Sequence, residues 1–119
     1  MYWSQPVTTG TKPARRAGHS LSTVGGSLVI FGGCGEEGIR KNDVHLMDVG
    51  SMHFYRPRVQ GDSQPENRSY HTAVAVGRRL YVFFGCDGEK EYDDVWYLDI
   101  GVPPLSHGPD SHRFRQPWS

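Results

Sequence analysis

Histidine and cysteine are the residues in this sequence best suited to metal or nucleophilic chemistry, and both occur as spaced pairs. His19 and His71 stand at the same separation along the chain as Cys34 and Cys86. A structural zinc site needs close ligand pairs, with cysteines about two to four residues apart, and neither cysteine has such a neighbour. We therefore expect no metal ion, and we favour histidines that tether neighbouring strands by hydrogen bonds.

Other motifs that support chemistry are missing from the sequence. His45 and His53 fall on different predicted strands, and there is no Gly-x-Ser-x-Gly elbow, phosphate-binding loop or dinucleotide fingerprint. We expect no catalytic residue and no cofactor. The 13 basic and 13 acidic residues cancel. Because binding to nucleic acid or to a membrane surface uses a net basic footprint, neither is an expected partner.

An internal repeat explains why these residues occur in pairs. The matching segments are 16–20 with 68–72, 28–31 with 80–83, and 42–48 with 93–99. The length differences between the two copies fall in loops rich in glycine and proline, which is where a structural repeat tolerates them. Repeats of this length indicate one supersecondary unit that is copied and stacked on its neighbour.

Each repeat predicts a small antiparallel sheet. The first strands, 19–24 and 71–76, consist mainly of small and β-branched residues, and the second strands, 28–31 and 80–84, are apolar without alternation. Such a run is typical of a sheet covered on both faces. Third strands are predicted at 44–49 and 95–100, and a fourth at 54–59. Four-stranded units of about 50 residues are typical of β-propeller blades.

The residues that recur resemble the kelch family. Its pattern of proline, arginine and histidine, a strand, an aromatic with two glycines, Asn-Asp-Val, and a strand ending in aspartate is carried by residues 13–48 and again by 65–99. Two departures are Phe84 at a diglycine position and Phe54 where tryptophan is usual. The resemblance implies an all-β fold of kelch-type propeller blades, each a four-stranded antiparallel sheet, with an incomplete ring in this chain.

The domain organisation follows from the repeat. We expect residues 1–15 to supply the outer strand and loop of a preceding or shared blade, because Trp3 precedes Gly10 as Phe54 precedes Gly61. Residues 16–61 form repeat 1, and 62–100 form repeat 2 without its outer strand. Residues 101–119, which contain four prolines and no apolar periodicity, are expected to be a disordered tail.

Two blades cannot close a ring, because propellers use about four to eight. We expect either that the chain is part of a longer protein or that it self-associates through open blade faces. Three copies would give a six-bladed ring. Equivalent points on packed sheets lie about 10 Å apart, too far for a disulfide between Cys34 and Cys86, so both thiols are expected to be reduced.

The repeated arginines, Arg16 and Arg68, leave two hypotheses open. In the kelch propellers that this sequence resembles, arginines at the entry to the inner strand often bind acidic or C-terminal groups of peptides. A guanidinium can pair with a carboxylate through two parallel hydrogen bonds. Alternatively, they pair with Asp43, Asp94 or loop carbonyls and brace the blade. The long loops 35–41 and 87–92 should share the recognition face. Their candidate partner-binding residues are Glu36, Glu37, Arg40, Lys41, Asp87, Glu89, Lys90 and Tyr92.

The resemblance favours a non-enzymatic protein-interaction module that docks a peptide or loop, in substrate recruitment or scaffolding. One alternative is a fragment of a kelch enzyme, such as a copper oxidase or an iron-dependent specifier protein. The second type places Glu, Asp and His in sequence, and here Glu89 and Asp93 are followed by Tyr97 instead of histidine. A structural remnant without its own partner is the other alternative. Since residues 1–6 show no secretory signal, we expect a cytoplasmic or nuclear location.

Overall fold

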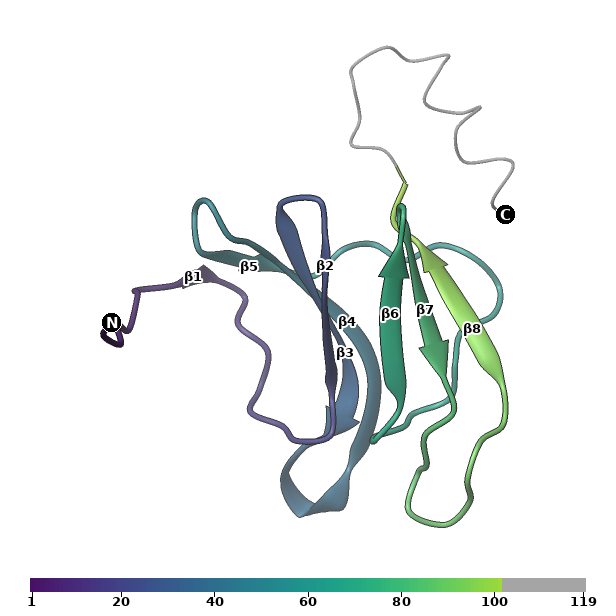
Figure 1. Cartoon of the computed structure of the whole chain (residues 1–119). Coiled ribbons are helices and arrows are strands. Elements are labelled where there is room, and N and C mark those ends of the chain that lie inside the picture. The colour runs from purple at the N-terminus through teal and green to yellow at the C-terminus, as the bar shows by residue number, and fades with distance from the viewer. Residues whose placement is uncertain (102–119) are drawn as a thin grey trace.

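The computed structural model describes residues 1–101 of the 119-residue chain as two adjacent β-sheets (Figure 1). In the first sheet, the strands lie in the order β1-β5-β4-β3-β2, and in the second the order is β6-β7-β8. We call these sheets the first and the second blade. The all-β prediction with antiparallel blades and an unclosed ring is confirmed. The predicted tail lies, apart from Gly101, outside the described residues.

The first blade contains the four predicted strands, with different bounds. They are β2 (Ser20–Val24), β3 (Ser27–Cys34), β4 (Arg40–Asp48) and β5 (His53–Tyr55). β3 and β4 are longer than predicted because they continue to pair up to Cys34 and Arg40, and the short 3-10 helix η1 (Glu36–Gly38) joins them. β5 is shorter than the predicted 54–59, because only its first residues pair with β4.

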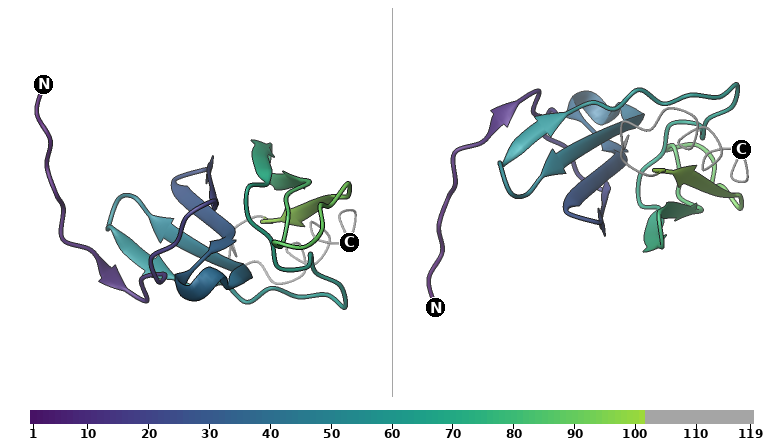
Figure 2. Two further views of the ribbon diagram at one scale, coloured as in Figure 1. Left: turned by 90° about the horizontal axis from the view of Figure 1, so that it is seen from below. Right: turned by 90° about the horizontal axis from the view of Figure 1, so that it is seen from above.

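The N-terminal segment adds a short strand that the sequence did not indicate. β1 (Thr9–Gly10) pairs in parallel with β5, and Thr9 Oγ1 lies 2.8 Å from His53 Nδ1. Residues 1–8 form no strand, and Trp3 is fully exposed. Figure 2 shows this segment running away from both sheets. That residues 1–15 complete another blade stays a prediction.

The second blade consists of β6 (Thr72–Val76), β7 (Arg79–Phe83) and β8 (Val95–Asp99), all antiparallel. β7 ends at Phe83, and the next residue, Phe84, adopts a left-handed backbone, with φ at 64°. Gly32, the equivalent residue in the first blade, has φ at 68°, and the β3–β4 register shifts there. The bend is therefore common to both repeats, and Phe84 adopts it without the freedom of glycine.

The core lies between the two blades. Each strand there alternates, so one set of side chains from each sheet faces the other sheet. The buried side chains of this interface are Val24, Val29, Phe31, Val44 and Leu46 from the first blade and Leu80 and Val82 from the second. Ala73, Ala75, Trp96 and Leu98 pack against them.

Candidate partner-binding groove

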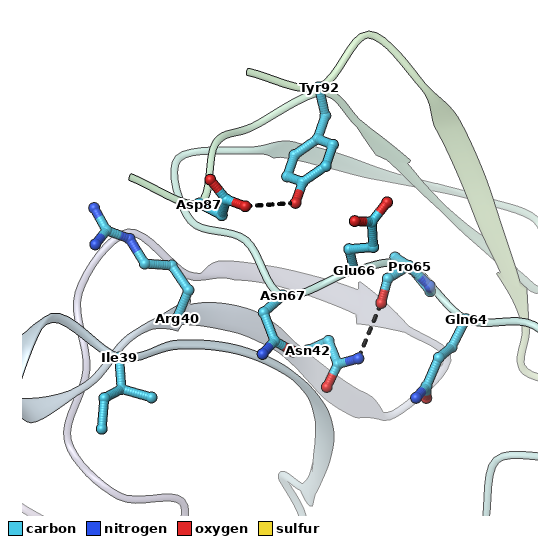
Figure 3. A pocket seen from close by; sticks show the side chains of 9 residues that line it. All are labelled: Ile39, Arg40, Asn42, Gln64, Pro65, Glu66, Asn67, Asp87 and Tyr92. Carbon is cyan, nitrogen blue, oxygen red and sulfur yellow. Dashed lines mark hydrogen bonds between the residues drawn. The ribbon is translucent and has the colours of Figure 1, made fainter. Parts of the chain in front are cut away.

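An open groove of about 600 Å³ lies where loops of the two blades meet (Figure 3). Its lining comes from the start of β4, from the connection between the blades and from the loop after β7. The lining residues are Ile39, Arg40, Asn42, Gln64, Pro65, Glu66, Asn67, Asp87 and Tyr92. The prediction that the two long loops share a face is therefore consistent with the groove, to which each contributes two residues.

Backbone hydrogen bonds beside the groove tie the connection between the blades to both of them. The Arg68 amide donates to the Lys41 carbonyl at 3.1 Å, and the Ser69 amide donates to the Cys86 carbonyl at 2.8 Å. The side chain of Asn42 adds a hydrogen bond to the Pro65 carbonyl at 2.9 Å (Figure 3). These bonds hold the inter-blade connection against both blades, so the groove has a set shape before any ligand binds.

The loop after β7 is organised by one carboxylate, that of Asp87. Its Oδ1 accepts the backbone amides of Glu89 and Lys90, both at 2.9 Å, and its Oδ2 accepts the Tyr92 hydroxyl at 2.9 Å. The two amides and the hydroxyl lower the pKa of Asp87 to about 2. Desolvation and the bond to Asp87 raise the pKa of Tyr92 to about 12. Asp87 therefore serves to shape the loop.

Cations surround the Tyr92 ring. The guanidinium carbon of Arg68 lies 4.2 Å from the centre of the ring, and the ammonium of Lys90 lies 5.3 Å from it. Lys90 also forms an exposed ion pair with the groove residue Glu66, with 3.4 Å between Nζ and Oε2. Cation–π contacts of this kind favour a fixed ring position. Tyr92 is thereby held as a wall of the groove.

Arg40, at the start of β4, also lines the groove. Its Nε donates to Ser69 Oγ at 3.3 Å, and its Nη1 donates to the Gly38 carbonyl at 3.0 Å. A Cβ added at Gly88 would lie only 2.9 Å from Arg40 Nη1, so the glycine leaves room for the guanidinium. Arg40 therefore brings a positive charge to the groove, next to Gly88 of the loop after β7.

Comparison with known proteins assigns the repeats. Residues 1–111 match the KLHDC2/KLHL20/DRC7 Kelch-repeats domain. The chain belongs to the kelch-repeat family.

Several curated relatives share the kelch repeats. Adagio protein 3 of Arabidopsis thaliana is 38% identical over 99 residues, which cover 81% of this chain and 16% of that protein. The serine/threonine-protein phosphatase BSL2 of Arabidopsis thaliana is 35% identical over 105 residues, covering 86% and 10%. The Rab9 effector protein with kelch motifs of Mus musculus is 36% identical over 97 residues, covering 78% and 25%. The chain thus spans a quarter or less of the length of these relatives.

The two kelch-motif arginines are buried and paired inside their blades. Arg16 Nη1 lies 2.6 Å from Asp43 Oδ1, and Arg68 Nη1 lies 2.7 Å from Asp94 Oδ1, with side-chain exposures of 5% and 0% for the arginines. Each arginine also donates to two backbone carbonyls. These are the contacts that the bracing hypothesis expects of Arg16 and Arg68, and partner binding by the two arginines stays a prediction.

The braces hold their carboxylates ionised. Burial by itself raises the pKa of Asp43, but hydrogen bonds from Arg16 and His45 outweigh it and lower that pKa to about 2. Hydrogen bonds from Arg68 and from the Trp96 indole lower the pKa of Asp94 to about 2. Both pairs are therefore charged at neutral pH.

Other predicted candidates lie outside the groove. Glu36, Glu37 and Lys41 line a separate hollow of about 290 Å³ beside the first-blade loop, where Glu36 also pairs with the exposed Arg15. Glu89 is exposed, and its backbone amide donates to the Asp87 carboxylate. The structure therefore brings Arg40, Asp87 and Tyr92 to one site, with Lys90 beside it, and leaves the remaining predicted candidates elsewhere.

Sequence reasoning missed the connection 64–67. Gln64, Glu66 and Asn67 line the groove, yet nothing in a polar inter-repeat loop separates them from ordinary solvated residues. A usable signal was present in Pro65 and Asn42, which both belong to the repeat pattern and prove to bond to each other. Within residues 1–101, no group of three His, Cys, Asp or Glu side chains is placed to hold a metal ion. That same part of the chain includes no helix able to cross a membrane.

Proposed function

We propose that the chain is a non-enzymatic protein-interaction module that docks a peptide or loop of a partner protein in the groove between its two kelch blades. The observation that carries the proposal is the convergence of three loop segments on one open, polar groove, whose inter-blade connection is held by backbone hydrogen bonds to both blades. A peptide lying there would meet hydrogen-bonding side chains from both blades. We place this function in recruitment or scaffolding, within the cytoplasm or nucleus.

The chemistry of the lining supports binding over catalysis. A general acid or base needs a pKa near the working pH, whereas the pKa of Asp87 is about 2 and that of Tyr92 about 12. Both groups therefore keep one protonation state across the physiological range. The name of one relative, the Rab9 effector protein with kelch motifs, describes an effector of another protein. A binding role for the present chain is in keeping with that name.

The test is selection of peptides from a randomised display library against the 119-residue chain, followed by affinity measurement on the selected peptides. Gln64 and Asn67 are exposed lining residues, so changing them leaves the blades intact. We expect Gln64→Arg, which fills the groove, and Asn67→Ala to weaken binding by about tenfold or more, equivalent to about 1.4 kcal/mol.

The matched control is Gln60→Arg, which places the same side chain on the same connection but outside the groove. It should leave the affinity unchanged. Fluorescence anisotropy of labelled peptides measures all three variants. Selected peptides that bind Gln64→Arg as tightly as the unchanged chain, or a library that yields no binder, would contradict the proposal.

A further inference from the structure

The two blades contact each other through opposite faces of their equivalent sheets. The repeat therefore identifies the kind of surface that would match each face left uncovered. At the blade interface, Val24 and Val29 of the first blade face Leu80 and Val82 of the second. The repeat equivalents of Val24 and Val29 are Val76 and Tyr81, which alternate to the other side of the second blade. The outward face of the second blade is thus the counterpart of the first-blade face that is already buried.

The same relation holds in reverse for the first blade. The inward residues Leu80 and Val82 of the second blade correspond to Leu28 and Ile30, which point away from the interface. Beside them on the neighbouring strand lies Leu21, paired with Ile30 and 55% exposed. We call these three residues, with Thr23 and Met47, the first-blade outer face.

The second-blade outer face is largely apolar and is open to solvent. Its apolar and aromatic residues are Val74, Val76, Tyr81, Phe83, Val95 and Tyr97, whose positions on paired strands place them on one side of the sheet. Arg79 lies on the same side, with its guanidinium carbon 4.1 Å from the centre of the Tyr97 ring. Val74 is 48% exposed, Val76 61% and Val95 53%. The first-blade counterparts of Val76 and Val95, which are Val24 and Val44, are buried, at 6% and 9% exposed. A sheet face with this composition is stabilised when another sheet covers it.

An unpaired strand edge and an exposed N-terminal segment accompany the outer faces. β8 pairs with β7 on one side, and within residues 1–101 no strand pairs with its other edge. In the first blade the corresponding edge of β4 carries β5, with Phe54 opposite Met47. The repeat makes Trp3 the equivalent of Phe54 and Leu98 the equivalent of Met47. Trp3 belongs to the exposed N-terminal segment, which contacts neither sheet (Figure 2).

We propose that a second copy of this chain docks its first-blade outer face on the second-blade outer face. In doing so it adds its residues 1–5 to β8 as the missing outer strand. The contact continues the blade interface already present within the chain, with Leu21 of one copy against Val74 and Val76 of the other. The added strand runs antiparallel to β8, with Trp3 opposite Leu98, as Phe54 lies opposite Met47.

Such a contact joins two different surfaces, so it is heterologous and repeats head to tail until a ring closes. With two blades in each chain, rings of about four to eight blades contain two to four copies. The proposal concerns surfaces separate from the loop groove, so it stands or fails independently of peptide binding.

Size-exclusion chromatography with light scattering on the full chain tests the proposal. We expect one species with a mass two to four times 13.4 kDa. Val74→Glu and Leu21→Glu should each give a monomer, because each puts a charge on one half of the contact while leaving the buried core unchanged. Val59→Glu is the matched control: Val59 is 47% exposed but lies on neither face, so the assembly should persist.

A mixing experiment identifies the heterologous geometry. Val74→Glu retains an intact first-blade outer face, and Leu21→Glu retains an intact second-blade outer face. Mixed together, the two monomeric variants should form a species containing one chain of each. If each face instead bound the same face of another copy, one of the two variants would still assemble without the other. That result, or an unchanged chain that stays monomeric at its highest soluble concentration, overturns the proposal.

The strand addition has its own readout. Trp3→Ser should raise the concentration at which the assembly half-dissociates by about tenfold, since burial of the indole is lost. Far-UV circular dichroism confirms that the variant keeps its blades, because Trp3 is fully exposed within one chain. An unchanged dissociation midpoint would overturn the strand pairing.

Discussion

Arg68 and Asp94 form a bidentate ion pair inside the second blade, with Nη1 to Oδ1 at 2.7 Å and Nη2 to Oδ2 at 2.9 Å. The guanidinium also donates to the carbonyls of Glu66 and Phe84. It therefore ties the entry of the blade to the end of β7 and to the residue that precedes β8. Arg16 repeats the arrangement with Asp43 in the first blade.

Removing this brace should destabilise the fold. We expect Arg68→Ala to lower the free energy of unfolding by about 3 kcal/mol, because it leaves a carboxylate and two carbonyls without their buried partner. Urea denaturation followed by circular dichroism measures the loss. The control is Arg15→Ala, whose pair with Glu36 is solvent-exposed and should contribute less than about 1 kcal/mol. Equal losses from both variants would show that Arg68 does not brace the blade.

Acid should weaken the blade interface before it disrupts the braces. His71 donates to or accepts from Ser20 Oγ at 2.8 Å across the interface, and its ring meets Phe31 edge-on at 5.1 Å. Burial lowers the pKa of His71 from 6.5 to about 4, with the charge of Arg68 adding to the effect. Between these pH values the unfolded chain binds more protons than the folded one, so stability falls as the pH drops from 6.5 to 4.

The size of this acid effect is about 3 kcal/mol at most, and it should vanish in His71→Gln. A second loss should follow from about pH 4 down to 2, where Asp43 and Asp94 become protonated. Urea denaturation at a series of pH values measures both. The matched control is His19→Gln, the exposed equivalent in the first blade. If His19→Gln removed the first loss and His71→Gln did not, the assignment to His71 would be wrong.

The carboxylate of Asp87 should control the ionisation of Tyr92. In Asp87→Asn the hydroxyl loses its charged acceptor, so the pKa of Tyr92 should fall from about 12 toward its usual value of 10. Difference titration of phenolate absorbance against Tyr92→Phe isolates this tyrosine from the others. Asp62→Asn, an exposed change on the inter-blade connection, is the control and should leave the titration as it was. An identical Tyr92 titration in Asp87→Asn would contradict the bonding described for the loop.

Both cysteines should remain thiols. Cys34 and Cys86 are free in the structure, each at the same position of its own blade. Without reductant, the denatured chain should therefore react with two equivalents of a thiol reagent, one per cysteine. Mass spectrometry before and after reduction measures the same property. A mass that rises by two hydrogens on reduction would reveal a disulfide and contradict the blade geometry.

The sequence by itself determined the repeat, the order of the strands and the all-β class, because these depend on local patterns of apolar, β-branched and glycine residues. It also named Asp43 and Asp94 as partners for the arginines. It could not choose between bracing and binding, since that choice depends on burial. Burial was decided only when the ends of the strands and the inter-blade connection came together around Arg16 and Arg68.

The two repeat-equivalent histidines show most clearly what the sequence determines and what the tertiary structure decides. His19 and His71 are indistinguishable in the repeat, yet His19 is exposed and His71 is 8% exposed. The difference arises because the first blade covers His71, whereas no blade within the described residues covers His19. Likewise, Gln64 and Asn67 became groove residues only through the pairing of the connection with both blades. A sequence repeat copies residue types, but the solvation of each copy depends on the neighbour that packs against it.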